Sequence, residues 1–279
     1  MNGNQLRRLV NKAAKAYADQ CRLPNYPSLN PKEPTILFFA DQDRRVHGNF
    51  LNASYNVICG NPEWKRRLAK PHSRRRDALP EEHRAEAKEL DSCTSSDALL
   101  MNVFCCPGLF LHDPFVQLLG LPETAEPSLV FGFKARVPLH CFRVDATEVD
   151  LKVEDLLIEA KLTENDFKKK RADAVERYRD FESVFESASL CTQDGYYLNY
   201  QLIRNVLAAY HLGARFRLIC DARRDDLIDA ACNVLSAVRV PGLRAKCGII
   251  TWQEIAHCAT ETLQEFLSDK YGIASSHGV

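Results

Sequence analysis

Residues 147–164, TEVDLKVEDLLIEAKLTE, decide the fold that we expect for this chain. Apolar and polar side chains alternate on both arms of the stretch, a pattern typical of β-strands. Glu154 and Asp155 are the residues expected to form a two-residue turn between the arms. The hairpin then has the register Val153–Leu156, Leu151–Ile158, Asp150–Glu159 and Glu148–Lys161. A slip of one residue would mix polar and apolar side chains on one face, so the pattern itself favours this register.

The same register brings charged residues together on one face of the hairpin. Asp150 lies opposite Glu159, and directly opposed residues have Cβ atoms about 4.5–5.5 Å apart. Two carboxylates at that distance repel each other, so a divalent cation is expected between them. Lys161 is two residues beyond Glu159 on the same strand and therefore shares its face. This combination predicts a metal-dependent phosphodiesterase, because Mg²⁺ prefers carboxylate oxygens and a nearby ammonium can stabilise charge on a phosphate.

Asp150, followed by Glu159-Ala160-Lys161 after a short turn, resembles the D…(D/E)xK signature of the PD-(D/E)XK, or restriction-endonuclease-like, nucleases. Val149 stands where the name of the motif has proline. The resemblance implies that Asp150, Glu159 and the backbone carbonyl of Ala160 hold Mg²⁺, with Mn²⁺ as a substitute, and that Lys161 positions the attacking water. It also implies nucleic acid as the partner, with double-stranded DNA favoured, and admits a homodimer.

A structural hairpin without a site is the alternative interpretation of this stretch. Roughly one E-x-K is expected by chance in a chain of this length, given ordinary amino-acid usage. Glu86-Ala87-Lys88 is a second copy, within a charged run that we interpret as the solvated face of a helix. Strand context, matched register and the elements downstream favour the site at residues 150–161.

The remaining elements predict an α/β fold of the restriction-endonuclease-like class, with a mixed central sheet flanked by helices and an N-terminal helical extension. Residues 1–90 are expected to form a largely helical accessory region, and residues 91–279 the nuclease-like core. We expect helices at residues 5–20, from Ser95 or Ser96, at 164–187, over YYLNYQLIRNVLAAYHL (196–212), at 226–238 and before Gly272. We expect a short buried strand or an apolar anchor at 34–41, and strands over SLVFGFKARVPL (128–139), RFRLICD (215–221) and CGIITW (247–252).

Two further residues are candidates for the site. Family members often carry an additional acid on the first core helix, and Asp97 could fill that role, although an Asp in a first helical turn is also favoured by the helix dipole. Several nuclease branches place a glutamine on a helix after the site, as Gln201 is placed here. Gln201 and Asn205 share one helix face, which could point at the site or simply be solvated.

Net charge is zero over 279 residues, but the basic residues are segregated into clusters that could contact phosphates. One cluster spans residues 65–76. The candidates for phosphate binding near the site are Lys168, Lys169, Lys170 and Arg171 directly after the hairpin, and Arg223 and Arg224 after the strand at 215–221. Charged faces that only solvate the protein explain clusters of this kind as well, and a loop charge pair explains Asp221-Ala222-Arg223-Arg224.

Composition narrows the class of protein. There are 11 cysteines but no C-x-x-C pair, which argues against zinc-ribbon and redox motifs and makes a reducing cytoplasm the simplest compartment. No window approaches the ~20 apolar residues of a membrane span. The leading hypothesis is a Mg²⁺-dependent nuclease, with DNA the favoured substrate and a restriction or repair role. The alternatives are a catalytically inactive nucleic-acid-binding or assembly protein of the same fold, and a purely structural domain.

Overall fold

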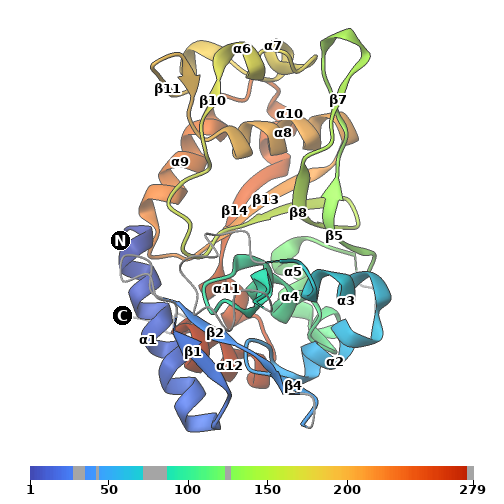
Figure 1. Cartoon of the computed structure of the whole chain (residues 1–279). Coiled ribbons are helices and arrows are strands. Elements are labelled where there is room, and N and C mark those ends of the chain that lie inside the picture. The colour runs from blue at the N-terminus through green and yellow to red at the C-terminus, as the bar shows by residue number, and fades with distance from the viewer. Residues whose placement is uncertain (28–34, 42–43, 72–86, 123–126, 275–279) are drawn as a thin grey trace. The chain divides into compact units, whose positions relative to one another are not determined.

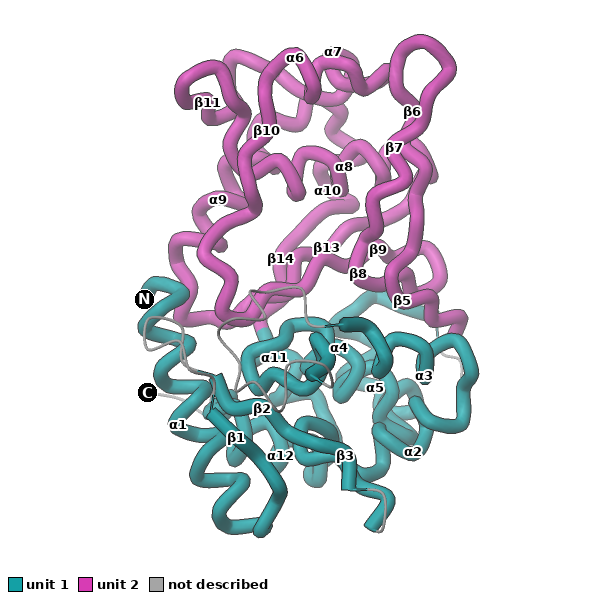
Figure 2. The backbone as a smooth tube through the Cα atoms, viewed as in Figure 1, with its two compact units in different colours: residues 1–126, 252–279 teal, residues 127–251 magenta. Residues whose placement is uncertain are grey.

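The computed structural model describes residues 1–27, 35–41, 44–71, 87–122 and 127–274. Two compact units make up the chain (Figure 2). Unit 1 contains residues 1–126 and 252–279, and unit 2 contains residues 127–251. The division into two units does not test whether residues 1–90 form an accessory region, so that region stays a prediction. In the described part of the chain, no helix combines the length and the apolar character that a membrane span requires.

Unit 1 is mainly helical. Its first helix begins with a capping box in which Asn2 and Gln5 satisfy each other's backbone N–H groups. The helices have these bounds: α1 Gly3–Cys21, α2 Asn52–Gly60, α3 Pro62–Leu68, α4 Ser96–Phe104, α5 Asp113–Leu119, α11 Trp252–His257 and α12 Glu261–Tyr271. The short strands are β1 Asn25–Pro27, β2 Ile36–Phe38, β3 Ala40–Asp41 and β4 Val46–His47. Figure 1 shows α1 and α12 side by side, and the Tyr17 and Phe266 rings meet edge to face at 5.8 Å.

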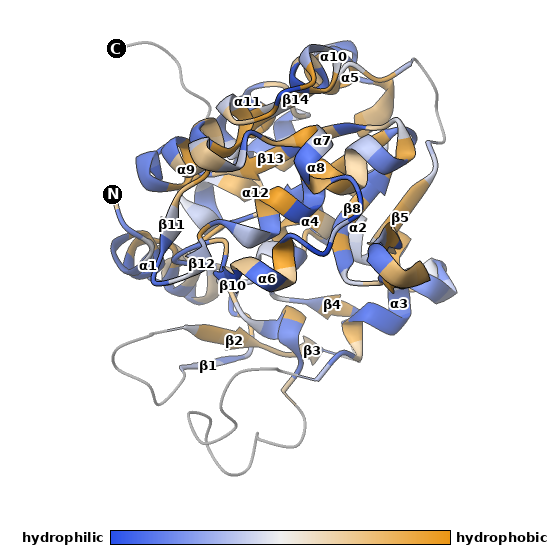
Figure 3. Cartoon of the chain, turned by 90° about the horizontal axis from the view of Figure 1, so that it is seen from above, coloured by the Kyte–Doolittle hydropathy of each residue, from blue (hydrophilic) through white to orange (hydrophobic). Residues whose placement is uncertain are grey.

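Several expectations for unit 1 are confirmed. The amphipathic helix at residues 5–20 lies within α1, and β2 is fully buried inside the apolar segment 34–41. Ser95 is the N-cap of α4, since its side chain accepts a hydrogen bond from the backbone N of Ala98 at 3.1 Å. The basic segment 65–67 lies on α3, which has no buried residue and is largely hydrophilic in Figure 3. Most of the charged run 81–90, including Glu86, lies outside the described residues.

Unit 2 is built on a five-stranded mixed sheet in the order β14-β13-β9-β8-β5, counting the strands that the structure describes. Pairing is parallel between β9, β13 and β14, and antiparallel between β8 and its neighbours β9 and β5. The bounds of these strands are β5 Leu129–Lys134, β8 Glu148–Val153, β9 Leu156–Ala160, β13 Arg215–Cys220 and β14 Cys247–Thr251. The α/β restriction-endonuclease-like fold class predicted from the sequence is confirmed.

The catalytic hairpin of the prediction is β8 and β9. Its ladder pairs Val153 with Leu156 and Leu151 with Ile158, as the hydrophobic pattern predicts. The predicted pairs Asp150–Glu159 and Glu148–Lys161 are not part of the described ladder, and the side chain of Asp150 accepts the Ala160 N–H instead. Glu154, the first residue of the turn, has φ 50°, in the positive-φ region that two-residue hairpin turns of types I′ and II′ use at this position. Five consecutive residues of β9 are buried. The second arm is therefore covered on both faces, whereas alternation had suggested one polar, exposed face.

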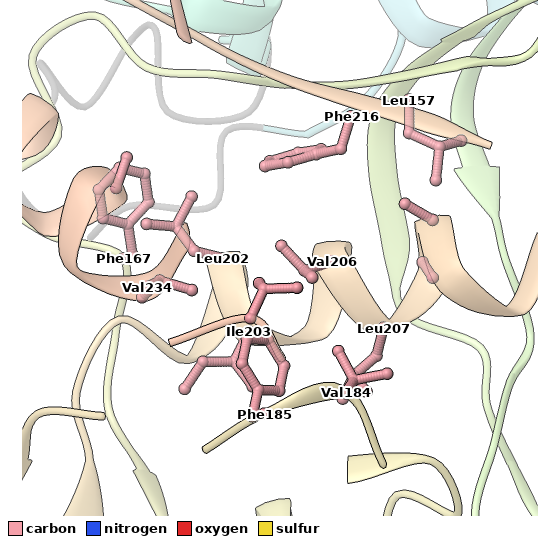
Figure 4. Close-up of a cluster of buried hydrophobic side chains, with 14 of the residues drawn as sticks. Leu157, Phe167, Val184, Phe185, Leu202, Ile203, Val206, Leu207, Phe216 and Val234 are labelled. Carbon is pink, nitrogen blue, oxygen red and sulfur yellow. The ribbon is translucent and has the colours of Figure 1, made fainter. Parts of the chain in front are cut away.

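Helix α8, Tyr200–Leu212, packs against one face of β9. Leu157 and Phe216 of the sheet belong to the same buried cluster as Leu202 and Val206 of α8 (Figure 4). Two further helices lie between β13 and β14 in the sequence, α9 Asp225–Ser236 and α10 Pro241–Lys246. The predicted strand at 215–221 and helices at 196–212 and 226–238 correspond to β13, α8 and α9.

The prediction of one long helix at residues 164–187 is wrong. The segment contains β10 Lys170–Arg171, α6 Ala172–Val175 and α7 Phe181–Val184. Asp166 accepts a hydrogen bond from the backbone N of Lys168 at 2.8 Å, and Lys168 has φ 60°, so a turn precedes β10. β10 then pairs with β12, Tyr196–Tyr197, which also pairs with β11, Thr192–Gln193. The apolar residues of this segment have helical spacing, but the turn at Lys168 and the pairing of β10 with β12 determine its conformation.

Candidate active site

The end of β9 carries a buried ion pair. Glu159 has 1% and Lys161 6% of its surface exposed, and their Oε1 and Nζ atoms lie 2.6 Å apart. Leu157 packs against α8, and Glu159 is two residues further along the same face, so its side chain points toward the start of that helix. The backbone N of Lys161 donates to the carbonyl of Ile219 in β13 at 2.8 Å, which fixes the strand beyond Ala160.

Asp150 lies where β8 and β9 separate. In the described ladder their pairing ends at Leu151–Ile158, although β8 continues beside β5 as far as Glu148. Asp150 Oδ2 instead accepts a hydrogen bond from the backbone N of Ala160 at 2.8 Å. Successive residues of a strand direct their backbone groups to opposite edges, and Lys161 faces β13. The carbonyl of Ala160 therefore faces the same edge as the Asp150 carboxylate.

Helix α8 supplies amide donors to the Glu159 carboxylate. Gln201 Nε2 lies 3.1 Å from Glu159 Oε1, and Asn205 Nδ2 lies 2.7 Å from Oε2. The two residues are four apart and thus share a helix face, as expected from the sequence. The helix start is held in place by backbone bonds from Tyr200 to the carbonyl of Lys168 and from Gln201 to that of Phe167, at 2.9 and 3.0 Å.

Arg204 is a site residue that the sequence analysis missed. Its side chain is 3% exposed, its Nη2 donates to the carbonyl of Glu148 at 2.8 Å, and the same atom lies 3.9 Å from Glu159 Oε2. Arg204 also donates to Asn205 Oδ1 at 2.8 Å. The signal in the sequence was its position three residues after Gln201, next to Asn205 and flanked by apolar residues on both sides in LIRNVL.

Electrostatics keep both members of the ion pair charged. Burial alone would raise the pKa of Glu159, but the charges of Lys161 and Arg204 and the hydrogen bonds from Lys161 and Asn205 outweigh it and lower the pKa. Burial would lower the pKa of Lys161, but the carboxylates of Glu159, Asp150 and Glu164 raise it above its ordinary value. The site therefore holds a carboxylate and an ammonium side by side away from solvent.

A polar cleft of about 300 Å³ opens beside the start of α8. Its lining includes Asp145, Lys170, Arg177, Tyr178 and Tyr200. The Tyr178 hydroxyl donates to the Asp145 carboxylate and contacts the Tyr200 hydroxyl at 2.8 Å. Burial would raise the pKa of Asp145, but hydrogen bonds from Thr147 and Tyr178 lower it. Lys170 was a candidate for phosphate binding, but the sequence did not indicate that it shares a cleft with Asp145, Tyr178 and Tyr200, since these residues come from three separate segments.

Among the other predicted site residues, Asp97 lies in unit 1. It occupies the first turn of α4, and its Oδ2 is 2.9 Å from Arg67 Nη2 and 4.0 Å from Lys70 Nζ. Burial raises the pKa of Asp97 despite these two cations. An ion pair of this kind accounts for the residue structurally, and its catalytic role stays a prediction.

The residues predicted to contact phosphate differ in their surroundings. All four residues of the 168–171 cluster are exposed; Lys169 lies over the Tyr196 ring, Lys170 lies over the Tyr200 ring, and Arg171 pairs with Asp173. Arg223 pairs with Asp221 at 2.7 Å. The Arg224 side chain is 0% exposed and pairs with Asp226 at 2.8 Å, so it does not reach a ligand at the surface in this arrangement.

The donor set suits a hard divalent cation. Within the described residues no three His, Cys, Asp or Glu side chains form a metal-binding group. Mg²⁺ commonly takes only one or two protein carboxylates, with water and substrate phosphate oxygens completing its shell. The Asp150 and Glu159 carboxylates and the Ala160 carbonyl are such oxygens, and they come from two neighbouring strands.

Comparison with known proteins agrees with this arrangement of strands. No curated protein and no solved structure matches the chain. A protein-family model described as Restriction Endonuclease associating with ARP matches residues 15–272, which is most of the chain. Such a description indicates a nuclease and, with it, a nucleic-acid substrate. The chain belongs to this family of restriction-endonuclease-like proteins.

Proposed function

We propose that this protein is a Mg²⁺-dependent nuclease that hydrolyses phosphodiester bonds in double-stranded DNA, in a restriction or repair role. The observation that carries the proposal is the buried Glu159–Lys161 pair, 2.6 Å apart, next to Asp150 at the point where β8 and β9 separate. A charged pair removed from water is costly unless its partners compensate, so purely structural packing explains it poorly. Perturbed charges at such a position are typical of functional sites.

In the proposed reaction, Asp150, Glu159 and the Ala160 carbonyl would hold the metal ion. Bound Mg²⁺ would acidify a water molecule and neutralise charge that develops on the phosphate. Lys161, kept protonated by its acidic neighbours, would orient the attacking water and offset negative charge in the transition state. Gln201 and Asn205 fix the position of the Glu159 carboxylate, and Arg204 ties α8 to the backbone of β8.

The test is cleavage of plasmid and linear DNA with Mg²⁺ and with a chelator. Glu159→Gln and Asp150→Asn remove one charge each while keeping the shape of the side chain, and each should lower cleavage on the order of 10²-fold or more. Asp155→Asn is the matched control, because Asp155 lies on the turn of the same hairpin and pairs with Arg215. Its cleavage rate should equal that of wild type. Wild-type protein without metal-dependent cleavage of DNA or RNA would exclude the proposal.

A catalytically inactive nucleic-acid-binding protein is the second candidate. The observation in its favour is that both oxygens of Glu159 already accept hydrogen bonds, from Lys161 and Gln201 on one side and from Asn205 on the other. A metal ion would have to compete with these donors. Mg²⁺ titration by calorimetry in the absence of DNA separates the candidates: a nuclease should show a saturable heat of binding that Asp150→Asn abolishes, whereas an inactive protein should bind DNA in chelator and show no metal binding.

A further inference from the structure

A two-stranded arm extends the catalytic strand β8. Its strands are β6, Val137–Pro138, and β7, Val144–Asp145, and they keep the register of the β5–β8 ladder below them. Figures 1 and 2 show the arm as the continuation of β5 and β8. Backbone bonds hold its outer end to the segment between α6 and α7: His140 donates to the carbonyl of Arg177 at 2.8 Å, and Arg179 donates to that of Pro138 at 3.1 Å. The arm is thus a supported structure.

The tip of the arm presents an aromatic ring to solvent. Phe142 is 107% exposed, far above the other exposed large apolar side chains of unit 2. Cys141 and Phe142 have φ values of 64° and 59°, a left-handed conformation that glycine adopts more easily. Strain at consecutive residues persists only where the surroundings hold it, and it concentrates at functional sites. A fully exposed ring in such a turn buries no apolar surface, so packing does not account for it.

The segment from Lys134 to Arg143 is basic, and the acidic residue of the arm, Asp145 of β7, is half-buried and accepts hydrogen bonds from Thr147 and Tyr178. Lys134, Arg136 and Arg143 are exposed, as is His140, and residues 134–143 contain no acidic residue. None of these four side chains forms an ion pair with a residue that the structure describes. Free cations on both sides of an exposed ring match a polyanion that also offers flat apolar surfaces, and nucleic acid has both features.

We propose that the β6–β7 arm contacts duplex DNA beside the scissile phosphate, with Phe142 inserted against the bases and Lys134, Arg136 and Arg143 on the phosphates. The inference rests on the proposed function, because it takes DNA as the partner. Phe142 is eight residues from Asp150, which at ~3.3 Å per residue limits its reach to about 26 Å along the strand. With a rise of ~3.4 Å per base pair, the contact should fall within about eight base pairs of the cut. Apolar wedges of this kind unstack base steps.

The experiment measures binding in chelator, so that its outcome does not depend on cleavage. A duplex carrying 2-aminopurine at successive positions reports unstacking by its fluorescence. Phe142→Ala should weaken binding roughly tenfold and remove the fluorescence change, and Phe142→Trp should restore both. Tyr210→Ala is the matched control, since Tyr210 is 38% exposed on α8 of the same unit and should leave both unchanged.

The basic residues are tested by salt dependence. Replacing Lys134, Arg136 and Arg143 together by Gln should lower the slope of log K against log salt by about 0.9 for each phosphate that the variant no longer neutralises. Replacing the exposed Arg8, Lys12 and Lys15 of α1 removes the same charge and should leave the slope unchanged. The proposal is overturned if Phe142→Ala binds as wild type does, if the α1 variant shows as large a decrease in slope, or if wild type binds phosphatidylserine vesicles and not DNA. If wild type cleaves DNA but Phe142→Ala binds DNA as tightly as wild type, the proposal for the arm fails and the nuclease proposal is unaffected.

Discussion

The two units each bury a lysine, and they do so in opposite ways. In unit 2, Lys161 is 6% exposed, its ammonium lies 2.6 Å from Glu159, and further carboxylates are near. In unit 1, Lys270 is 0% exposed, and its Nζ has no hydrogen-bond partner among the described residues. Lys270 is instead surrounded by rings, with the centroids of Tyr271, Phe38 and Phe266 at 3.6, 5.5 and 5.7 Å from its Nζ.

The different surroundings of the two lysines determine which of them stays charged near neutral pH. Carboxylates outweigh the effect of burial on Lys161 and raise its pKa. Burial lowers the pKa of Lys270 to about 7, because the nearby rings replace only part of the lost hydration. Lys161 is therefore positively charged at any physiological pH, as its proposed role at a phosphate requires. Lys270 changes its charge near neutrality.

The largest effect should come from Lys161→Met. This substitution leaves Glu159 buried without its nearest cation, and removal of one partner from a buried pair costs about 3–5 kcal/mol. Urea unfolding, together with amide hydrogen exchange in β9 and β13, measures the loss. The pKa of Glu159 should rise at the same time, because its largest favourable electrostatic interaction has gone. A stability equal to that of wild type would mean that Arg204 alone compensates Glu159.

The same substitution at the other lysine should have the opposite sign. Lys270→Met removes a buried ammonium without a hydrogen-bond partner and places a polarisable thioether among the rings. At pH 6 we expect a gain of about 1–3 kcal/mol, the usual cost of a buried unsatisfied polar group. Hydrogen exchange in α12 reports the gain, and Lys12→Met on the exposed face of α1 is the control. Destabilisation at pH 6 would show that the cation–π contacts outweigh desolvation.

The pH dependence of stability should follow Lys270 and not Lys161. The pKa of Lys270 is about 7 in the folded chain, against an ordinary value of 10.5. Between these values the unfolded chain binds one more proton, so folding stability should rise with pH, by up to about 1.4 kcal/mol per unit from this group. Below pH 7 the contribution is flat. Denaturation midpoints between pH 6 and 10 should lose this rise in Lys270→Met, and an unchanged profile would contradict it.

The raised pKa of Lys161 has the reverse sign. Its folded state holds the proton more tightly than the unfolded chain does, so its contribution is complete below pH 10.5 and is lost only as pH rises through the folded pKa. Lys161 therefore adds nothing to the pH dependence between 6 and 10. Buried thiols such as Cys105, whose pKa burial raises, also contribute near the alkaline end of this range, so the difference between the wild-type and Lys270→Met profiles is the quantity that reports Lys270.

Sequence reasoning predicted the parts of the site that depend on local spacing. The register of β8 and β9 followed from alternation, and the common face of Gln201 and Asn205 followed from helical periodicity. Arg204 escaped notice, because an arginine within an apolar helix has no local signature of its partner. Its hydrogen bond to the carbonyl of Glu148 spans 56 residues of sequence and exists only after α8 docks on the sheet.

The error at residues 164–187 has a related cause. Val175, Tyr178, Phe181 and Val184 are all buried at spacings of three, which suits a helix. The structure buries them with short helical turns separated by the bridge from Tyr178 to Leu139 of the β6–β7 arm. A partner strand 39 residues upstream thus decides the local conformation, and periodicity within one segment carries no information about it.

The smallest effect on stability should come from cations that are not buried at all. Lys168, Lys169 and Lys170 are exposed, and two of them lie over tyrosine rings at 5.1 and 5.4 Å. Replacing all three by Gln should change the free energy of unfolding by only ~0.5 kcal/mol, as is usual at surfaces. If the cluster binds phosphates, DNA affinity should fall and the salt slope should decrease by about 0.9 per phosphate. Fluorescence anisotropy at several salt concentrations measures this, with the α1 charge variant as control. An unchanged slope would assign these lysines to solvation, and the cation that matters for phosphate would then be the buried Lys161, whose charge is held by its acidic neighbours and not by water.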